Sequence, residues 1–507
     1  MQTVYDMLRR ATARSPGAPA LVDPRIGLRV SYADLLSRVE RSAAGFRAAG
    51  VARSDRIAVV PSNSVEWIVA ILALHRAEAV PALLNPRLKP AELAELTAIG
   101  EMAAAVVPAN AAYGTALRDA CSRKLLFTVA GSGAGDVSQL DANAPALPEP
   151  SPAPGDAAFV FYTSGTTGLP KGAVIPHLAA ENRVLFMATQ AGYRYGAHNC
   201  ILGLMPLYHV IGFFAVLVQA LAFNGRYIVV PEFNPVEVLS IIETEQVTGL
   251  FVTPTHLDAL LAAMGRTQAS LASLQHVTFA GATMPDPLLK QVNEKLPGEK
   301  VNIYGTTEMM NSLYLRSPSS GTLLQPGFFS EVRLVRPDGG VYDLVQPGQE
   351  GELLVSTRSD AAFCGYLNRP DATAQKVGDG WYRTSDMAVQ RSDGLLEILG
   401  RVDDMIISGG ENVHPSEIEK VLGSHPSVAE VAVVGVADQR WGQKIVACVV
   451  TKGEGTLGPQ ELDDLCRKSN LADFKRPKQY VFLRELPKSA VNKVLRRELV
   501  SVAAQTD

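Results

Sequence analysis

A run of hydroxyl, glycine and lysine residues follows a short apolar segment about one third of the way along the chain. Phe159–Tyr162 has the composition of a buried strand, and a glycine- and threonine-rich turn comes directly after it. Glycine lets the backbone approach an anion, hydroxyls donate hydrogen bonds, and lysine adds positive charge. The spacing differs from a Walker A loop, where Lys and Ser or Thr follow the last glycine directly. The stretch therefore predicts a phosphate-binding loop rather than a polar surface turn, and its residues are Thr163, Ser164, Gly165, Thr166, Thr167, Gly168 and Lys171.

Composition and length limit the class of protein. The chain has 507 residues, so more than one domain is expected, and its 47% hydrophobic and 19% charged residues are typical of a globular protein. A net charge of -4 gives no electrostatic case for binding nucleic acid. The longest apolar run, Gly212–Phe223, is too short for a membrane span, and no signal peptide is visible. Five cysteines without a Cys-x-x-Cys pair indicate reduced thiols, so a cytoplasmic protein is expected.

The order of apolar and helical segments predicts an α/β fold. Strand-like and helix-like segments alternate from Arg56 to Tyr304, the pattern of a parallel sheet with helical crossovers. From Glu331 short strands with Asp-Gly and Pro-Gly turns predict a small β-rich unit that ends at Arg401. We place a domain boundary near Asp403, which gives a large N-terminal part (1–402) and a compact α+β C-terminal module (403–507).

Several separated motifs occur together along the chain. They are Tyr162–Lys171, Tyr304-Gly-Thr-Thr-Glu308, Tyr382-Arg-Thr-Ser-Asp386, Gly400-Arg401 and the tail around Lys493. In this order they resemble the superfamily of adenylate-forming enzymes, which comprises acyl- and aryl-CoA ligases, luciferases and the adenylation domains of peptide synthetases. Met205–Phe214 and Ile406–Pro415 are most similar to the aryl-CoA ligase branch. The resemblance implies a large N-terminal domain (1–402) of two α/β subdomains plus a small β-barrel-like unit, with a mobile α+β C-terminal domain (403–507). It also implies an acid–thiol ligase that uses ATP, Mg²⁺ and coenzyme A to activate a 4-halobenzoate, with 4-chlorobenzoate as the expected acid.

The resemblance assigns roles in the adenylation step. Glu308 is implied to help hold Mg²⁺, and Thr307 to contact the α-phosphate. Tyr304 is implied to stack on adenine, Asp386 to accept the ribose hydroxyls, and Arg401 to lie on the ribose or phosphate side. Lys493 matches the C-terminal catalytic lysine, although Asn492 stands where relatives have glycine. Taken singly, each of these residues is equally typical of a surface loop, a strand end or a core.

The acyl group is implied to bind in an apolar slot without a cation. His209 matches a histidine expected near the acyl carboxylate, although a lone histidine among apolar residues is more often a core group. An apolar slot suits a flat aromatic acid, because a second carboxylate would lose its solvation there. The remaining pocket candidates are Phe186, Val210, Ile211, Phe251, Ala282, Ile303, Met310 and Asn311.

A second group of residues is implied for coenzyme A. Asp403 matches a hinge, and Gly409 and Gly410 are implied to line a narrow tunnel for the pantetheine arm after the C-terminal domain has rotated. Trp441 is the candidate wall of that tunnel. The candidates for the nucleotide of coenzyme A are Arg87, Phe474, Arg476 and Lys478, and a solvated basic patch is the alternative.

The sequence leaves open alternatives for the acid, for the thiol and for catalysis itself. The acid could be another benzoate or a medium-chain or cyclic carboxylate, because pocket changes of one methylene alter specificity by only about 1–3 kcal/mol. The thiol could belong to a carrier protein, although no carrier domain is appended to this chain. A nucleotide-binding relative without catalysis is a third reading. A homodimer is compatible with the resemblance, and no partner other than the small-molecule acid is expected.

Overall fold

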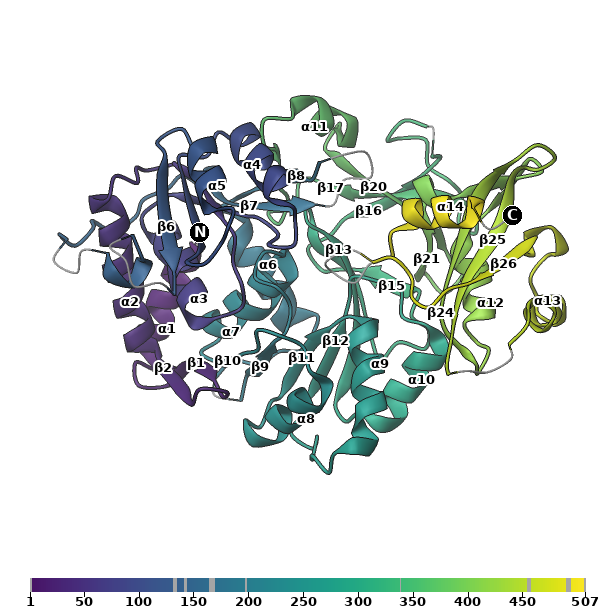
Figure 1. The fold of residues 1–507 in the computed structure, drawn as a ribbon, viewed down its shortest axis with the longest axis horizontal. Helices are drawn as coiled ribbons and strands as arrows, with labels where there is room; N and C mark the ends of the chain where they lie inside the picture. Colours follow the sequence, from purple (N-terminus) through teal and green to yellow (C-terminus); the bar gives the residue numbers. More distant parts are fainter. Residues whose placement is uncertain are drawn as a thin grey trace.

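The computed structural model describes residues 2–130, 135–140, 144–163, 169–196, 198–337, 339–453, 457–488 and 494–505. Figure 1 shows the first α/β unit at the left in purple and blue and the next α/β unit below the centre in teal. The C-terminal unit lies at the right in yellow-green and yellow, next to helix α10 of the teal unit. The mixed α/β class expected from the sequence is confirmed.

The first sheet contains seven strands among the described residues, in the order β18-β8-β7-β4-β3-β5-β6. Strands β3, β4, β5, β6 and β7 pair in parallel, whereas β8 returns antiparallel to β7. Their bounds are β3 Arg56–Val59, β4 Val80–Leu83, β5 Ala104–Pro108, β6 Leu125–Val129, β7 Ala157–Thr163, β8 Lys171–Pro176 and β18 Gly365–Tyr366. The helices between the parallel strands are α3 (Val65–Arg76), α4 (Pro90–Ile99) and α5 (Gly114–Ala120).

A second, longer sheet runs β16-β17-β20-β21-β15-β14-β13-β12-β11-β9-β10-β1-β2. Its middle strands β9 to β13 pair in parallel. The strands from β14 to β17 and β20 to β21 pair antiparallel. Strands β16, β17, β20 and β21 fall in the stretch predicted to be β-rich, and β14 and β15, which precede Glu331, join it to the parallel strands; the pairing path is open in the described residues. The bounds are β1 Pro19–Asp23, β2 Leu28–Ser31, β9 Cys200–Gly203, β10 Arg226–Val229, β11 Gly249–Val252, β12 His276–Phe279, β13 Glu299–Thr306, β14 Met310–Arg316, β15 Leu323–Pro326, β16 Val332–Val335, β17 Glu350–Ser356, β19 Val377–Gly378 (paired with β20), β20 Trp381–Gln390 and β21 Leu396–Arg401.

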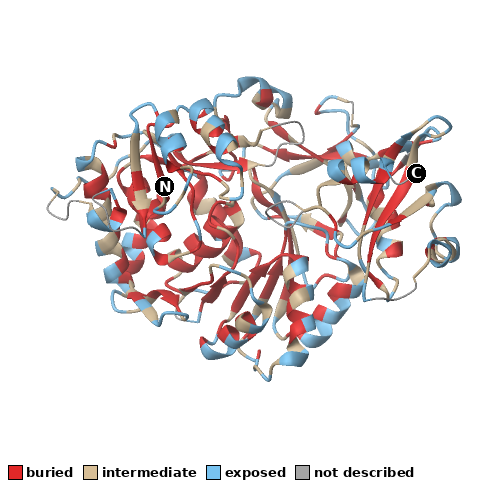
Figure 2. Ribbon diagram, in the orientation of Figure 1, coloured by how far each residue is buried: buried red, intermediate tan, exposed pale blue. Residues whose placement is uncertain are grey.

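The helices pack on the faces of these two sheets. Figure 2 shows buried residues concentrated in the strands and on the helix faces toward them, with exposed residues on the outer helix faces. The apolar segment Ile211–Val218 is a π-helix (η2) that continues into α7 (Gln219–Ala222), and its aromatic side chains lie in the same core as those of β7. The other helices are α1 Val4–Arg14, α2 Tyr32–Ala48, η1 Val137–Gln139, α6 Ala179–Thr189, α8 Pro235–Thr244, α9 Pro254–Ala263, η3 Met264–Arg266, α10 Asp286–Lys295 and α11 Pro370–Lys376.

The C-terminal unit has its own sheet and its own hydrophobic clusters. Its strands are β22 Ile406–Ser408, β23 Glu411–Val413, β24 Val428–Asp438, β25 Gly442–Thr451 and β26 Gln479–Phe482. Its helices are α12 Pro415–Leu422, α13 Pro459–Lys468, η5 Asp473–Lys475 and α14 Arg496–Ala504. The 3₁₀ turn η4 (Val402–Asp404) joins it to β21. A boundary at Asp403 stays a prediction.

One hydrogen-bonded histidine–carboxylate pair and one salt bridge hold the C-terminal unit against the rest of the chain. His414 Nε2 lies 2.8 Å from Glu350 Oε2, and Lys420 Nζ lies 3.1 Å from Asp286 Oδ2. Both pairs join residues next to or within α12 to the long sheet or its helix α10. Any rotation of the C-terminal unit therefore has to break them.

Within the described ranges, none of the helices combines the length and the apolar character that crossing a lipid bilayer requires.

Two buried histidines, His75 of α3 and His177 after β8, lie with ring centroids 5.0 Å apart. Burial lowers the pKa of His177 from 6.5 to about 4, against the charges of Asp156 and Asp6, and lowers the pKa of His75 well below its ordinary value. The unfolded chain therefore binds protons first as the pH falls below 6.5. Stability conferred by the neutral imidazoles is complete above pH 6.5 and is lost toward pH 4.

We expect His177→Gln to reduce this pH dependence. Each pH unit between the two pKa values of one group corresponds to about 1.4 kcal/mol, so His177 accounts for about 2 kcal/mol between pH 6.5 and pH 5. Urea unfolding at both pH values measures the change, and His198→Gln, at an exposed position, is the control. An unchanged pH dependence in His177→Gln would contradict the expectation.

Candidate active site

The predicted phosphate-binding loop is the connection of the β7–β8 hairpin. Thr163 ends β7 and pairs with Lys171 at the start of β8, and the Thr163 hydroxyl donates to the Lys171 carbonyl at 3.4 Å. The loop residues Ser164, Gly165, Thr166, Thr167 and Gly168 lie outside the described residues. The hairpin brings the two ends of the loop together, as closure around one ligand requires.

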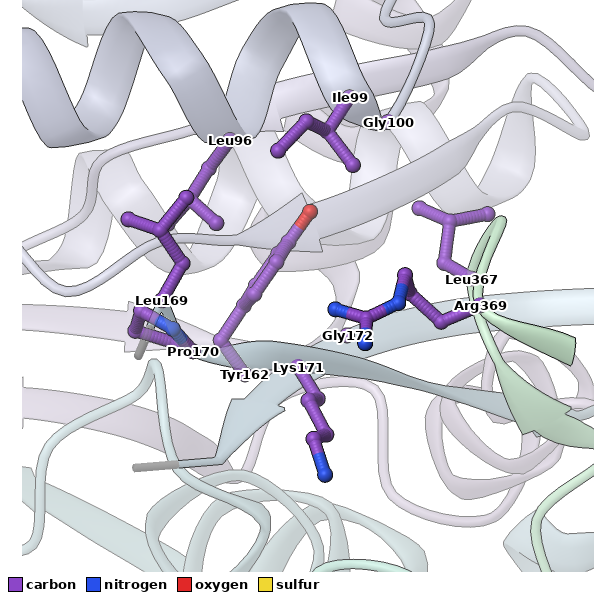
Figure 3. A pocket seen from close by; sticks show the side chains of 10 residues that line it. All are labelled: Leu96, Ile99, Gly100, Tyr162, Leu169, Pro170, Lys171, Gly172, Leu367 and Arg369. Carbon is purple, nitrogen blue, oxygen red and sulfur yellow. The ribbon is translucent and has the colours of Figure 1, made fainter. Parts of the chain in front are cut away.

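The two faces of this hairpin differ. A small cavity on one face is lined by Leu96 and Ile99 of α4, Tyr162, Leu169 and Leu367. Figure 3 shows the Tyr162 ring rising toward this helix while the Lys171 side chain runs to the opposite side of the strand. There the Lys171 ammonium lies 5.5 Å from the centroid of the Tyr366 ring, within the range of a cation–π interaction.

A second loop joins β13 to β14 and carries Glu308. The Thr306 hydroxyl accepts the N–H of Met309 at 3.1 Å, which closes the turn. The Glu308 residue is only 5% exposed, and its Oε1 accepts a hydrogen bond of 2.6 Å from the Tyr366 hydroxyl. Thr307 is half-buried beside it. The structure thus brings a buried carboxylate and the Lys171 ammonium to the same tyrosine.

Arg183 of α6 ties this loop to the segment that leads to Tyr366. Its guanidinium donates to the Ala361 carbonyl at 2.8 Å and to the carbonyls of Thr307 and Glu308 at 3.3 Å each. The residue is 1% exposed, and burial lowers the pKa of Arg183 to about 9, opposed by the charge of Glu308. Because several carbonyls share one buried cation, the two segments are held in a fixed relation.

The predicted nucleoside-binding residues form a separate cluster. Asp386 of β20 is directly opposite Arg401 of β21, and Arg401 Nη1 lies 3.4 Å from its Oδ1. The Tyr304 hydroxyl donates to Oδ2 of the same carboxylate. Burial and the Asp386 charge raise the pKa of Tyr304 well above its ordinary value, so the hydroxyl stays a donor.

Tyr382 connects the two clusters. Burial and then the charge of Glu308 raise its pKa well above 10, and Tyr366 and Tyr304 contribute to the same rise. Because groups of both clusters raise the pKa of Tyr382, the carboxylates of Glu308 and Asp386 border one region of the protein. Glu308 lies in the loop that follows β13, the kind of place where ligands of open α/β sheets bind, whereas Asp386 lies within β20.

His209 lies in the turn between β9 and η2. Its N–H donates to the Pro206 carbonyl at 3.1 Å, and its ring centroid lies 4.6 Å from that of Tyr208. Burial lowers the pKa of His209 to about 4, and Nε2 has no partner among the described residues. The imidazole is therefore neutral at pH 7. Arg87 lies in the exposed turn after β4. Its positive charge opposes the burial-driven rise of the Tyr208 pKa, so Arg87 lies near Tyr208.

Most of the predicted acyl-pocket residues share one cluster. Phe186, Val210, Phe251, Ile303 and Met310 are buried in the same hydrophobic core, and Ile211 packs against it. Asn311 is also buried, and its amide donates to the Met187 sulfur at 3.6 Å. Ala282, in contrast, is exposed in the loop after β12. A ligand among these residues meets apolar walls with one neutral amide.

The predicted coenzyme A residues, apart from Arg87, gather in the C-terminal unit. Gly409 and Gly410 form the turn of the β22–β23 hairpin with φ of +63° and +85°, and the Gly409 N–H donates to the Trp441 carbonyl at 2.8 Å. The Lys478 ammonium lies 5.1 Å from the centroid of the Trp441 ring. Arg476 pairs with Asp463 at 2.7 Å and with Asp473 at 3.1 Å, while Phe474 is exposed. Asp403 is exposed in η4, and Lys493 lies outside the described residues.

Sequence reasoning missed Arg183, Tyr366 and Tyr382 as members of the site. Arg183 had a usable signal, because it is a charge on the helix face that also carries Phe186, one turn away. Tyr366 had no such signal, because buried tyrosines are common in cores. Tyr382 stood at the start of a recognised motif, but no role was assigned to it.

The carboxylates of the candidate site can be compared with the ligands that the implied Mg²⁺ needs. The described residues contain no group of three or more His, Cys, Asp or Glu that could hold an ion. Mg²⁺ is commonly held by one or two carboxylates and completed by substrate phosphates and water. Glu308, buried beside the end of the phosphate-binding hairpin, fits this kind of site.

Two α/β units that bring together the hairpin predicted to bind phosphate, a buried carboxylate and the residues predicted to bind the nucleoside are the arrangement expected of a nucleotide-binding enzyme. The chain belongs to the AMP-binding enzyme family: that family matches residues 8–367, and the AMP-binding enzyme C-terminal domain matches residues 417–493.

Named relatives cover the whole chain. It is 54% identical over 514 positions to a 4-chlorobenzoate–CoA ligase of Pseudomonas sp. (strain CBS-3), with 100% of this chain and 95% of the relative covered. It is 43% identical over 500 positions to a 4-chlorobenzoate–CoA ligase of Arthrobacter sp., covering 98% and 95%. Among solved structures, ATP-bound MatB from Rhodopseudomonas palustris superposes with a TM-score of 0.90 at 26% identity over 99% of both chains.

Proposed function

We propose that this protein is an ATP-dependent aryl-CoA ligase whose acid is 4-chlorobenzoate. The observation that carries the proposal is the 54% identity to a 4-chlorobenzoate–CoA ligase over the full chain. The apolar surroundings of Phe186, Val210 and Ile303 support an aromatic acid without a second charge. The substrates are ATP, the benzoate and coenzyme A, and Mg²⁺ is the metal.

The reaction has two steps. A carboxylate oxygen of the benzoate attacks the α-phosphorus of ATP, and the bond to pyrophosphate breaks. The sulfur of coenzyme A then attacks the carbonyl carbon of the aryl adenylate, and the bond to AMP breaks. The first step concentrates negative charge at phosphorus, so donors and cations that are fixed in advance lower its barrier.

The chain supplies these groups from both of its parts. The β7–β8 loop with Lys171 receives the β- and γ-phosphates, Thr307 contacts the α-phosphate, and Glu308 would hold Mg²⁺, which neutralises phosphate charge. Asp386 accepts the ribose hydroxyls, with Arg401 on the ribose or phosphate side. Tyr304 has its hydroxyl committed to Asp386, which leaves its ring for adenine. Lys493 bridges the carboxylate and the α-phosphate.

His209 orients the acyl carboxylate. Its pKa of about 4 keeps the imidazole neutral at pH 7, so it can donate one hydrogen bond without forming an ion pair that would weaken the nucleophile.

The C-terminal unit serves both steps by rotating about Asp403. In the second orientation Gly409, Gly410 and Trp441 line the pantetheine tunnel, and Arg87, Phe474, Arg476 and Lys478 face the nucleotide of coenzyme A. A homodimer and a cytoplasmic location stay predictions.

Pyrophosphate release is the direct test. We expect release that requires both ATP and 4-chlorobenzoate, and 4-chlorobenzoyl-CoA formation once coenzyme A is added. Substitution of a carrier protein for coenzyme A distinguishes the alternative thiol. If no benzoate stimulates pyrophosphate release, the proposed function is wrong.

Ring substituents test the apolar slot. We expect kcat/KM for 4-carboxybenzoate to be about 100-fold lower than for 4-chlorobenzoate, because burying an unpaired carboxylate costs several kcal/mol, only part of which water can relieve. 4-Methylbenzoate, of similar size and without charge, is the control and should lie within about tenfold of 4-chlorobenzoate. Equal kcat/KM for the charged and uncharged acids would contradict an apolar slot.

A further inference from the structure

Tyr366 contacts two oppositely charged groups with different parts of its side chain. Its hydroxyl donates to the Glu308 carboxylate at 2.6 Å, and its ring centroid lies 5.5 Å from the Lys171 ammonium. Tyr366 and Glu308 are both buried, so water competes little for the hydrogen bond, while Lys171 is partly exposed. One side chain therefore determines where both charges lie.

The two charges do not meet directly. In the described part of the chain no ion pair joins Lys171 to Glu308, although both contact the same ring system. A direct pair would neutralise both groups, and breaking it when a ligand binds would cost part of the binding free energy. Separation keeps the ammonium available for phosphate oxygens and the carboxylate available for a cation.

The backbone fixes Tyr366 on both sides. Tyr366 pairs with Ala173 of β8, two residues from Lys171, and its N–H donates to the Thr373 hydroxyl at 2.9 Å. The N–H of Leu367 donates to the Gly172 carbonyl at 2.7 Å. The ring therefore moves together with the strand that carries Lys171.

Glu308 is fixed to the same segment by other contacts. The N–H of Phe363 donates to the Glu308 carbonyl at 2.8 Å, and the Phe363 ring packs edge-on against Tyr366 with centroids 5.1 Å apart. Arg183 holds the carbonyls of Glu308 and Ala361 together. Three independent contacts thus keep the carboxylate within reach of the hydroxyl.

We propose that Tyr366 is a positioning residue that holds the Glu308 carboxylate and the Lys171 ammonium apart at a fixed separation, so that the metal and the phosphates of MgATP meet both charges unneutralised. This role rests on the proposed function of the site as an ATP site. It needs no acyl substrate and no coenzyme A.

The hydroxyl is tested with Tyr366→Phe, which keeps the ring over Lys171. We expect the dissociation constant of MgATP, measured by calorimetry, to rise about tenfold or more, because a hydrogen bond to a charged acceptor is lost. The dissociation constant of ATP in the presence of a chelator should change less than about twofold, since Glu308 acts through the metal. An equal rise with and without Mg²⁺ would overturn the proposal.

A double-mutant cycle tests whether the hydroxyl acts through Glu308. In a Glu308→Gln background the Tyr366→Phe change should alter MgATP binding less than about twofold, because the charged partner is already absent. Effects that multiply in the double variant would show that Tyr366 acts independently of Glu308, which overturns the proposal.

Two further variants complete the design. Tyr193→Phe removes a buried hydroxyl that donates to the Leu250 carbonyl at 3.2 Å, at the opposite ends of the parallel strands, and should leave MgATP binding unchanged. Tyr366→Leu removes the ring as well and should weaken MgATP binding beyond Tyr366→Phe. MgATP binding by a chain that activates no benzoate would refute the proposed function alone, whereas the Tyr366 variants would still decide the positioning role.

Discussion

Replacement of Asp386 by alanine is expected to lower kcat/KM for ATP about 10³-fold. The carboxylate accepts hydrogen bonds from the Tyr304 hydroxyl and pairs with Arg401 at 3.4 Å, and in the proposed site it also accepts the ribose hydroxyls. Its removal deletes the ribose contacts and leaves a buried hydroxyl and a guanidinium without their acceptor. ATP–pyrophosphate exchange at saturating benzoate measures the loss.

Two other variants make this result specific. Asp386→Asn still offers an acceptor to Tyr304 and should recover part of the activity. Asp393→Ala, in the exposed turn of the same β20–β21 hairpin, should stay within about twofold of the unmodified enzyme, since exposed ion pairs contribute little. A loss in Asp393→Ala as large as that in Asp386→Ala would indicate damage to the hairpin rather than loss of nucleoside contacts.

Gly410→Leu is expected to slow thioester formation about 10³-fold and to leave adenylation nearly intact. In the present orientation a Cβ at Gly410 meets no atom within 4 Å, so the first atom of a side chain there has room. A leucine in a narrow pantetheine tunnel would obstruct the thiol, which could not reach the reacting carbon. Rapid-quench measurement of adenylate formation and of thioester formation separates the two steps.

Matched variants complete the test of domain rotation. Gly410→Ala has the same strain at φ +85° but little bulk, so it isolates the backbone cost of about 1–2 kcal/mol. Lys493→Ala should have the reverse effect: adenylation falls by orders of magnitude, and thioester formation from supplied aryl adenylate persists. If each variant slowed both steps equally, the rotation of the C-terminal unit would be contradicted.

The fold could be predicted where periodicity and turn residues agreed. The alternation from Arg56 to Tyr304 and the α+β character of the C-terminal unit were confirmed. Strand β1 was missed because Pro19–Asp23 has only three consecutive apolar residues and pairs with β10, more than 200 residues away. The π-helix Ile211–Val218 is apolar on every side, so it has no periodicity by which to recognise it.

The motifs of the candidate site could be predicted from the sequence, but the contacts that join their side chains could not. Tyr304, Glu308 and Asp386 stand in short segments whose composition marks them. The residues that position them lie outside such segments. The Tyr366 hydroxyl contacts Glu308 from 58 positions away, and Arg183 contacts it from 125 positions away. Such contacts follow from tertiary packing, which a single sequence does not specify.

The position of β1 affects how the chain folds during synthesis. Leu21 of β1 pairs with Tyr227 of β10, so β1 cannot form this pairing until about 200 more residues have been synthesised. At a translation rate of about 5–20 residues per second this interval is about 10–40 s. During that time β1 and its neighbour β2 form an unprotected hairpin edge on the ribosome, open to pairing with other nascent chains. The N-terminal segment is thus a part of this protein that we expect a chaperone to protect during synthesis.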